Sequence, residues 1–241
     1  MATLFISDLH LCPSRPEISR LFFRFLEREA RVAQALYILG DLFEYWAGDD
    51  DLGDPFNASI VAALAELPGR GVATYLMHGN RDFLIGTEFE RASGAKLLPD
   101  PSLLDLYGRS ALLMHGDTLC TLDAEYQAFR LEARSHSWID AMLAKPLAQR
   151  KAAIEAMRVR SEQEKARKNA AIMDVAPTEL ESTLRRHGYP RLIHGHTHRP
   201  TRHLHTVDGH TCERWVLADW YESGSYLTCD ESGCRAVDLS A

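Results

Sequence analysis

The 241-residue sequence has no apolar run near the roughly 18 residues that a membrane-spanning helix needs. It also lacks a positive excess, because 27 Lys and Arg face 34 Asp and Glu, which gives a net charge of −7. The chain starts without a cationic stretch and reaches an acid at Asp8, so we expect no signal peptide and a cytoplasmic protein. A chain this acidic is not expected to bind nucleic acid over its whole surface.

Cysteine is scarce and scattered. The five cysteines, which include no C-x-x-C pair, are Cys12, Cys120, Cys212, Cys229 and Cys234. An odd, dispersed set indicates neither a disulfide framework nor a zinc knuckle, so we expect reduced, mostly structural thiols. With 46% hydrophobic and 25% charged residues the composition is globular, and the length fits a single domain over residues 1–241 that carries an insertion.

Short apolar runs with the composition of buried strands recur along the chain. They cover residues 3–7, 36–39, 73–77, 111–114 and 191–193. Apolar residues at helical spacing predict amphipathic helices over 18–26 and 57–67. Strands that alternate with helices predict an α/β fold. Beyond residue 200, alternating apolar residues predict antiparallel strands that complete a second sheet.

The regular alternation of predicted strands and helices stops after His115, because 80 residues separate this histidine from His196. Residues 118–175 predict a helical insertion. Apolar residues at helical spacing surround Trp138, and residues 145–168 carry eight Lys or Arg against three Glu, a net +5. By themselves, a charge run is typical of a solvated helix face and an apolar stripe of a core. The basic run and the apolar stripe in one insertion together favour a lid over the predicted site.

Asp, Asn and His side chains stand beside glycine just after the predicted strands. In order, the fragments are Asp8-x-His10, Gly40-Asp41, Gly79-Asn80-Arg81-Asp82, His115-Gly116-Asp117 and Gly195-His196-Thr197-His198. One histidine at a strand end is more often structural, but five ordered fragments point to a shared site. The i, i+2 pairs are expected to lie on one face of an extended backbone. Oxygen and imidazole donors suit Mn, Fe, Co or Zn, and seven donors predict two ions bridged by a carboxylate.

This series resembles the calcineurin-like binuclear metallophosphoesterases, whose pattern is D-x-H, G-D, G-N-H-D/E, H-G and G-H-x-H. The resemblance implies a two-sheet sandwich flanked by helices. It assigns one metal to Asp8, His10, Asp41 and His198. It assigns the other to Asp41, Asn80, His115 and His196, with Asp41 as the bridge. His78 and His194 match no ligand position and are expected to be structural.

One position departs from the family pattern. Arg81 stands where the family usually has a histidine that protonates a leaving alkoxide. An arginine stays protonated at neutral pH and cannot act as a general acid. The leaving group should therefore need no proton, and a phosphate monoester, with a second pKa near ~6, qualifies. Arg81 is suited to bind phosphate oxygens, so the chemistry points to a pyrophosphate.

A closer resemblance is to the UDP-2,3-diacylglucosamine pyrophosphohydrolases of lipid A biosynthesis. It rests on residues 5–11, 37–50, 78–84, 115–120, 172–175 and 192–200. The resemblance implies two divalent cations, typically Mn²⁺, and attack of metal-bound hydroxide on the α-phosphorus to give UMP and 2,3-diacylglucosamine 1-phosphate. It implies catalytic roles for Asp41, Asn80, Arg81 and His196. It implies substrate contacts for Asn80, Arg81, Asp123, Ser161, Lys165, Lys168 and His196.

The apolar and cationic halves of the insertion suit a substrate that carries acyl chains and phosphates. The same surface suits peripheral attachment to the cytoplasmic side of an anionic inner membrane. We expect no obligate protein partner. Two alternatives stay open at this point: a soluble nucleotide pyrophosphatase or phosphodiesterase of the same superfamily, and a metal-free scaffold, which the intact ligand set disfavours.

Overall fold

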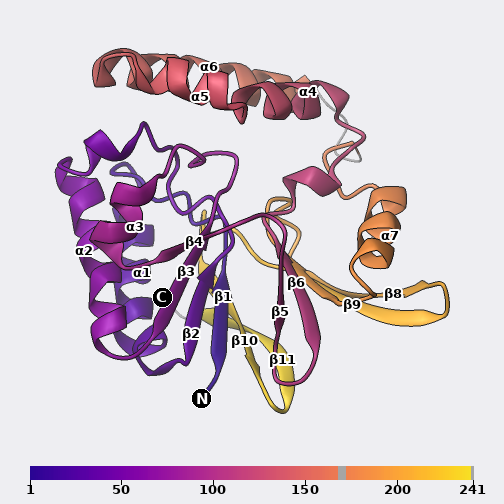
Figure 1. Cartoon of the computed structure of the whole chain (residues 1–241). Coiled ribbons are helices and arrows are strands. Elements are labelled where there is room, and N and C mark those ends of the chain that lie inside the picture. The colour runs from indigo at the N-terminus through magenta and orange to yellow at the C-terminus, as the bar shows by residue number, and fades with distance from the viewer. Residues whose placement is uncertain (168–171, 240–241) are drawn as a thin grey trace.

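The computed structural model describes residues 1–167 and 172–239. Two mixed sheets lie side by side under a layer of helices (Figure 1). The first sheet has the order β11-β10-β1-β2-β3-β4. Its strands are β1 (Thr3–Ile6), β2 (Ala35–Ile38), β3 (Ala73–Met77), β4 (Lys96–Leu98), β10 (Gly224–Asp230) and β11 (Gly233–Leu239). β1 to β4 are parallel, and β10 is antiparallel to β1.

The second sheet has the order β5-β6-β7-β9-β8. Its strands are β5 (Ser102–Asp105), β6 (Ser110–Met114), β7 (Arg191–His194), β8 (Thr201–Val207) and β9 (His210–Val216). The predicted two-sheet α/β sandwich is confirmed, and all five predicted buried strands are present. The strands β4 and β5 were missed because they have only three and four residues, with two leucines each, and so form no long apolar run.

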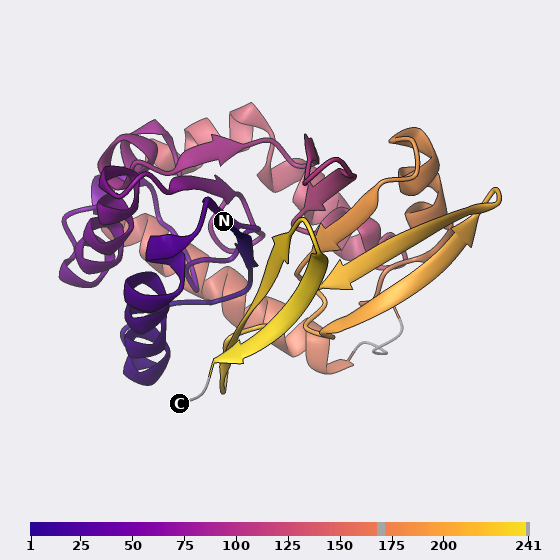
Figure 2. The ribbon, with the colours of Figure 1, turned by 90° about the horizontal axis from the view of Figure 1, so that it is seen from below.

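One prediction about the C-terminal part was wrong. Only β8 and β9 complete the second sheet, whereas β10 and β11 extend the first sheet beside β1. Figure 2 shows the separation from below, with β10 and β11 in yellow and β8 and β9 in orange. Alternation along a strand indicates which face is buried, but not which sheet edge the strand joins.

Helices cover the outer face of the first sheet. These are α1 (Pro16–Arg28), α2 (Pro55–Gly69) and α3 (Thr87–Ser93), and α7 (Pro177–Arg186) packs against the second sheet. Asp54 begins α2 because its carboxylate accepts hydrogen bonds from the backbone amides of Phe56 and Asn57. The two helices predicted in the N-terminal part are confirmed as α1 and α2.

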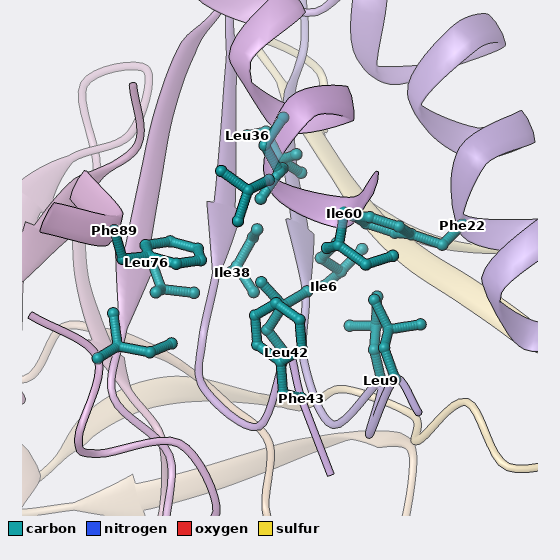
Figure 3. Close-up of a cluster of buried hydrophobic side chains, with 14 of the residues drawn as sticks. Ile6, Leu9, Phe22, Leu36, Ile38, Leu42, Phe43, Ile60, Leu76 and Phe89 are labelled. Carbon is teal, nitrogen blue, oxygen red and sulfur yellow. The ribbon is translucent and has the colours of Figure 1, made fainter. Parts of the chain in front are cut away.

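The strands divide their side chains between two cores. Along β1, Leu4 and Ile6 point to the helices, while Phe5 points to the space between the sheets. Figure 3 shows the helix-side core, where Phe22 and Ile60 reach the side chains of β1 and β2. Each fully buried aliphatic or aromatic side chain contributes about 1.5–3 kcal/mol, so the two layers hold the strand ends rigidly in place.

The described part of the insertion forms three helices above the carboxyl ends of the parallel strands (Figure 1). They are α4 (Ala124–Ala133), α5 (His136–Leu143) and α6 (Leu147–Arg167), and we call them the lid helices. The short helical turns η1 (Ala30–Val32), η2 (Asp49–Asp51) and η3 (Asp117–Leu119) lie in the connections. Among the described residues, none of the helices has the length and apolar character needed to span a bilayer.

The expectation that all cysteines are reduced was wrong. Cys229 and Cys234 form a disulfide across the β10–β11 hairpin, where they are register partners with Cα atoms 4.1 Å apart. The hairpin turn brings them opposite each other, which a search for C-x-x-C pairs does not detect. Cys12, Cys120 and Cys212 are free and buried, as expected.

Candidate metal centre and substrate cavity

The carboxyl ends of β1, β2, β3, β6 and β7 meet beneath the lid helices, and every candidate ligand follows one of them. Asp8 and His10 follow β1, Asp41 follows β2, Asn80 follows β3, His115 follows β6, and His196 and His198 follow β7. The topology therefore gathers residues from most of the chain at one edge of the sandwich.

Two groups of donor atoms form there. Asp8, His10 and His198 each offer an atom within 4.8 Å of the others, and so do Asp8, Asp41 and His115. The Nε2 atoms of His10 and His198 lie 3.4 Å apart, and His198 Nε2 lies 3.3 Å from Asp8 Oδ1. Two ring nitrogens and a carboxylate that converge in this way have the donor types of a transition-metal site.

Asp41 lies between the two groups. Its Oδ2 is 3.9 Å from His10 Nε2 and 3.9 Å from His115 Nε2. Its Oδ1 accepts a hydrogen bond of 2.8 Å from the backbone amide of Arg81, which leaves Oδ2 directed at both histidines. This placement is the one that a bridging carboxylate needs.

Asn80 completes the second group. Its Oδ1 lies 3.1 Å from His115 Nε2 and 2.9 Å from His196 Nδ1. The structure thus brings all seven predicted ligands together, four around Asp8 and His10 and the rest around Asn80 and His115.

The backbone at these residues differs from the extended form that the sequence suggested. Positive φ angles of 50° to 67° occur at Asp8, His10, Asp41, His196 and His198. The i, i+2 pairs reach one volume because left-handed residues curl the loops after each strand, and not because the strands continue. A non-glycine residue in this region costs on the order of 1–2 kcal/mol, and such strain clusters at functional sites.

Two glycines permit the close approach of neighbouring loops. A Cβ at Gly79 would lie 2.0 Å from Asp41 Oδ1, and a Cβ at Gly195 would lie 2.1 Å from Asp8 Oδ2. Any side chain would displace a candidate ligand, which explains the glycine in each of these fragments.

Burial governs the charges of the centre. Burial, together with Asp82 and Asp8, raises the pKa of Asp41 to about 7. Burial lowers the pKa of His115, but the charges of Asp41 and Asp8 outweigh it and raise the pKa to about 9. Burial likewise opposes ionisation of Asp8, yet a hydrogen bond from His198 and the charge of His115 hold its pKa below the ordinary value. Buried carboxylates beside imidazoles fit two divalent cations in both charge and donor type.

A cavity of about 670 Å³ connects this centre with the lid helices. Asn80, Arg81 and His196 line its lower part, and Asp123 and Ser161 line its wall on the lid side. The cavity is also lined by apolar side chains: Phe83, Phe129, Trp138, Ile154 and Met157. All described residues predicted to contact substrate therefore face one cavity. Lys168 and the side chain of Lys165 lie outside the described residues.

The apolar residues of α5 divide between two environments. Trp138 lines the cavity and approaches Phe83, with ring centroids 5.9 Å apart. Met142 is only 4% exposed and belongs to the helix-side core, while Leu143 is 40% exposed. The sequence analysis grouped the apolar residues of this helix together, whereas in the structure they divide between the core and the cavity.

Three of the eight cations in the basic run pair with acidic residues of the loop after β2, which the sequence did not predict. Arg150 pairs with Asp50, Lys151 lies 2.8 Å from Asp51, and Arg158 NH2 lies 2.8 Å from Glu44. The amino-terminal part of α6 is thus fastened to the acidic loop after β2, and these three cations are not left to a membrane.

Several residues around the centre escaped sequence reasoning. Tyr221 stacks on His10, with ring centroids 5.0 Å apart. The guanidinium of Arg15 lies 4.6 Å from the centroid of the same Tyr221 ring. Tyr126 of α4 stacks on His196 at 5.9 Å and donates a hydrogen bond to the buried Asp117. These tyrosines and arginines belong to no recognisable sequence motif, so their position beside the centre becomes clear only from the fold.

His78 and His194 bond to backbone carbonyls, as expected of structural histidines. A ring nitrogen of His78 lies 2.7 Å from the carbonyl of Ile85, and one of His194 lies 2.8 Å from that of Gly195.

The family model of the calcineurin-like phosphoesterases matches residues 1–200 of the chain. The chain belongs to the calcineurin-like phosphoesterase family. Within this family, it is 54% identical over 233 residues to the UDP-2,3-diacylglucosamine hydrolase of Aromatoleum aromaticum, covering 97% of this chain and 95% of the relative. It is 51% identical to the protein of the same name from Aeromonas salmonicida, covering 95% and 90% of the two chains. The Cellvibrio japonicus protein is 49% identical, with 97% of each covered. The resemblance inferred from the motifs is confirmed.

Proposed function

We propose that the protein is a metal-dependent hydrolase of UDP-2,3-diacylglucosamine that releases UMP and 2,3-diacylglucosamine 1-phosphate in lipid A biosynthesis. The observation that carries the proposal is the cavity itself, which connects the candidate metal ligands with apolar side chains of the lid helices. Relatives at 49–54% identity over nearly their whole length bear the corresponding name.

The proposed cofactor is a pair of divalent cations, which we propose to be Mn²⁺. One cation would be held by Asp8, His10 and His198, and the other by Asn80, His115 and His196. Asp41 would bind both cations. Such ions, when bound, polarise phosphoryl oxygens and lower the pKa of water to near neutrality.

Arg81 would bind the pyrophosphate. Its backbone is fixed by the hydrogen bond from its amide to Asp41, and its side chain lines the cavity next to Asn80. A guanidinium offers paired donors to phosphate oxygens and keeps its proton at neutral pH. The sugar phosphate would therefore leave as an anion without a proton from the enzyme.

The lid helices would supply specificity for the acyl chains. Phe129, Trp138, Ile154 and Met157 give the cavity an apolar wall, and each buried methylene of a lipid contributes about 0.8 kcal/mol. Asp123 begins α4 by accepting a hydrogen bond from the amide of Tyr126, and Ser161 faces the same space from α6.

We further propose that the protein attaches peripherally to the cytoplasmic side of the inner membrane, where a diacylated substrate resides. Large apolar side chains of the lid helices are exposed: Phe129, Leu131, Leu143 and Val159. They support contact with a lipid surface.

The test is hydrolysis of UDP-2,3-diacylglucosamine in water enriched in heavy oxygen, beside UDP-sugars that lack acyl chains. We expect the solvent oxygen in UMP and turnover that falls by at least about tenfold without the acyl chains. Label in the lipid phosphate would contradict attack on the α-phosphorus. Equal turnover of the unacylated UDP-sugars would indicate a nucleotide pyrophosphatase.

A further inference from the structure

Glu44, a residue outside all the ligand fragments, lies at the junction of the metal centre, the cavity and the lid. It follows β2 by six residues and is 7% exposed. Its Oε2 lies 2.9 Å from Arg15 NH2, and its Oε1 lies 2.8 Å from Arg158 NH2 and 4.0 Å from Arg81 NH1. One buried carboxylate thus holds guanidinium groups from α6, from the cavity wall and from the start of α1.

The same carboxylate faces the metal centre. Oε2 of Glu44 lies 3.6 Å from Nδ1 of His10, while Nε2 of His10 points to Asp8, Asp41 and His198. His10 is 2% exposed, and its Nδ1 has no hydrogen-bond partner in the part of the chain that the structure describes. A histidine that binds a metal through one ring nitrogen normally donates its other N–H to a carboxylate or carbonyl, which fixes the ring.

We propose that Glu44 is a positioning residue that couples metal binding at His10 to the docking of lid helix α6. The inference rests on the proposed metal-dependent function. A cation on Nε2 makes the Nδ1–H of His10 a stronger donor, which favours the Glu44 orientation that also holds Arg158. Coupling of this kind is reciprocal, so a docked α6 favours metal binding at His10.

An ordinary buried ion pair would behave differently. Loss of one partner from such a pair destabilises the protein whether or not a metal is present, because the remaining charge stays buried without its counterpart. The proposed coupling instead requires that Mn²⁺ alters the protection of α6, and that Glu44 carries this response.

The experiment combines Mn²⁺ titration by calorimetry with amide hydrogen exchange of α6, and it uses no lipid substrate. In the wild type we expect two bound Mn²⁺ ions and slower exchange over residues 150–164 when Mn²⁺ is added. Glu44→Gln should weaken one of the two ions by about 10- to 100-fold, leave the other within about twofold, and abolish the response of α6. Glu66→Gln removes an exposed carboxylate that pairs with Arg70 and should match the wild type.

A second variant separates the coupling from a folding defect. Arg158→Gln leaves the carboxylate beside His10 and should still bind two Mn²⁺ ions, but its α6 should no longer respond to them. Wild-type affinity for both ions in Glu44→Gln, or a persistent Mn²⁺ response of α6 in Arg158→Gln, would overturn the proposal. Loss of turnover on the lipid with these responses intact would count against the proposed substrate only.

Discussion

At the scale of single residues, the strained backbone of the centre is held by neighbouring loops. The amide of Asp8 bonds to the carbonyl of Gly40, and the amide of His10 bonds to that of Asp41. Each hydrogen bond contributes about 0.5–1.5 kcal/mol, which offsets strain of similar size. These hydrogen bonds therefore help to hold the candidate ligands in position.

Asp41 gives the most direct test of the centre. Asp41→Asn keeps the shape but removes the charge between the two donor groups, so we expect fewer than two bound Mn²⁺ ions and a loss of turnover of at least about 100-fold. Metal analysis of the dialysed protein and initial rates measure both effects. Asp238→Asn, at an exposed carboxylate, is the matched control. Wild-type turnover in Asp41→Asn would refute the bridging role.

Asp100 provides a prediction about pH and stability. Burial, together with the charge of Asp117, raises its pKa from 3.8 to about 6, so the folded state binds this proton more tightly than the unfolded state. The free energy of unfolding therefore falls as pH rises from about 4 to about 6 and stays lower above that. Asp100→Asn removes the buried charge and should raise the free energy of unfolding by on the order of 1–3 kcal/mol near pH 8.

The measurement is urea unfolding of wild type and Asp100→Asn at two pH values. The difference should shrink below about pH 5, where the carboxyl is protonated in the folded wild type. A gain of equal size at both pH values would show that the charge of Asp100 is not its cause.

The ligand residues could be predicted from the sequence because each one directly follows a buried strand, and parallel strands end at a common edge. Glu44, Arg15 and Tyr221 could not be predicted in this way. Their contacts with His10 arise only when the loop after β2, the start of α1 and the segment before β10 meet in the fold.

At the scale of elements, the lid helices show what periodicity can and cannot predict. Their existence followed from apolar spacing, but α5 packs against the core and also faces the cavity, so its apolar residues have two roles. The sheet that receives β10 was equally hidden, because alternation is the same in either sheet.

Two substitutions in α5 should separate these roles. Trp138→Ser removes part of the apolar wall and should lower kcat/KM for the diacylated substrate by about tenfold or more, with little effect on a small phosphodiester. Met142→Gln places an amide in the core and should lower the free energy of unfolding by about 1–3 kcal/mol, with both activities kept per folded molecule. Kinetics on both substrates and thermal unfolding measure these effects. Equal loss on both substrates for Trp138→Ser would make the lid merely structural.

At the scale of the whole molecule, net charge disfavours contact with an anionic membrane, whereas exposed apolar side chains favour it. The net charge of −7 opposes approach to an anionic bilayer, and Arg150, Lys151 and Arg158 are occupied by acidic residues of the loop after β2. Exposed apolar side chains of the lid helices remain, with Leu131 74% and Val159 45% exposed. The proposed membrane contact should therefore depend more on these side chains than on basic charge.

Co-sedimentation with vesicles that contain anionic phospholipids tests this expectation. A Leu131→Ser, Val159→Ser double variant should bind several-fold more weakly, because it removes apolar surface worth about 25 cal/mol per Å². Raising the salt concentration to about 1 M, where the Debye length is about 3 Å, should change binding little. Leu103→Ser with Leu204→Ser is the matched control, since these leucines are also exposed and lie on β5 and β8 of the second sheet. Binding abolished by salt would assign the contact to basic charge instead, and an equal loss in the control would exclude the lid helices as the contact surface.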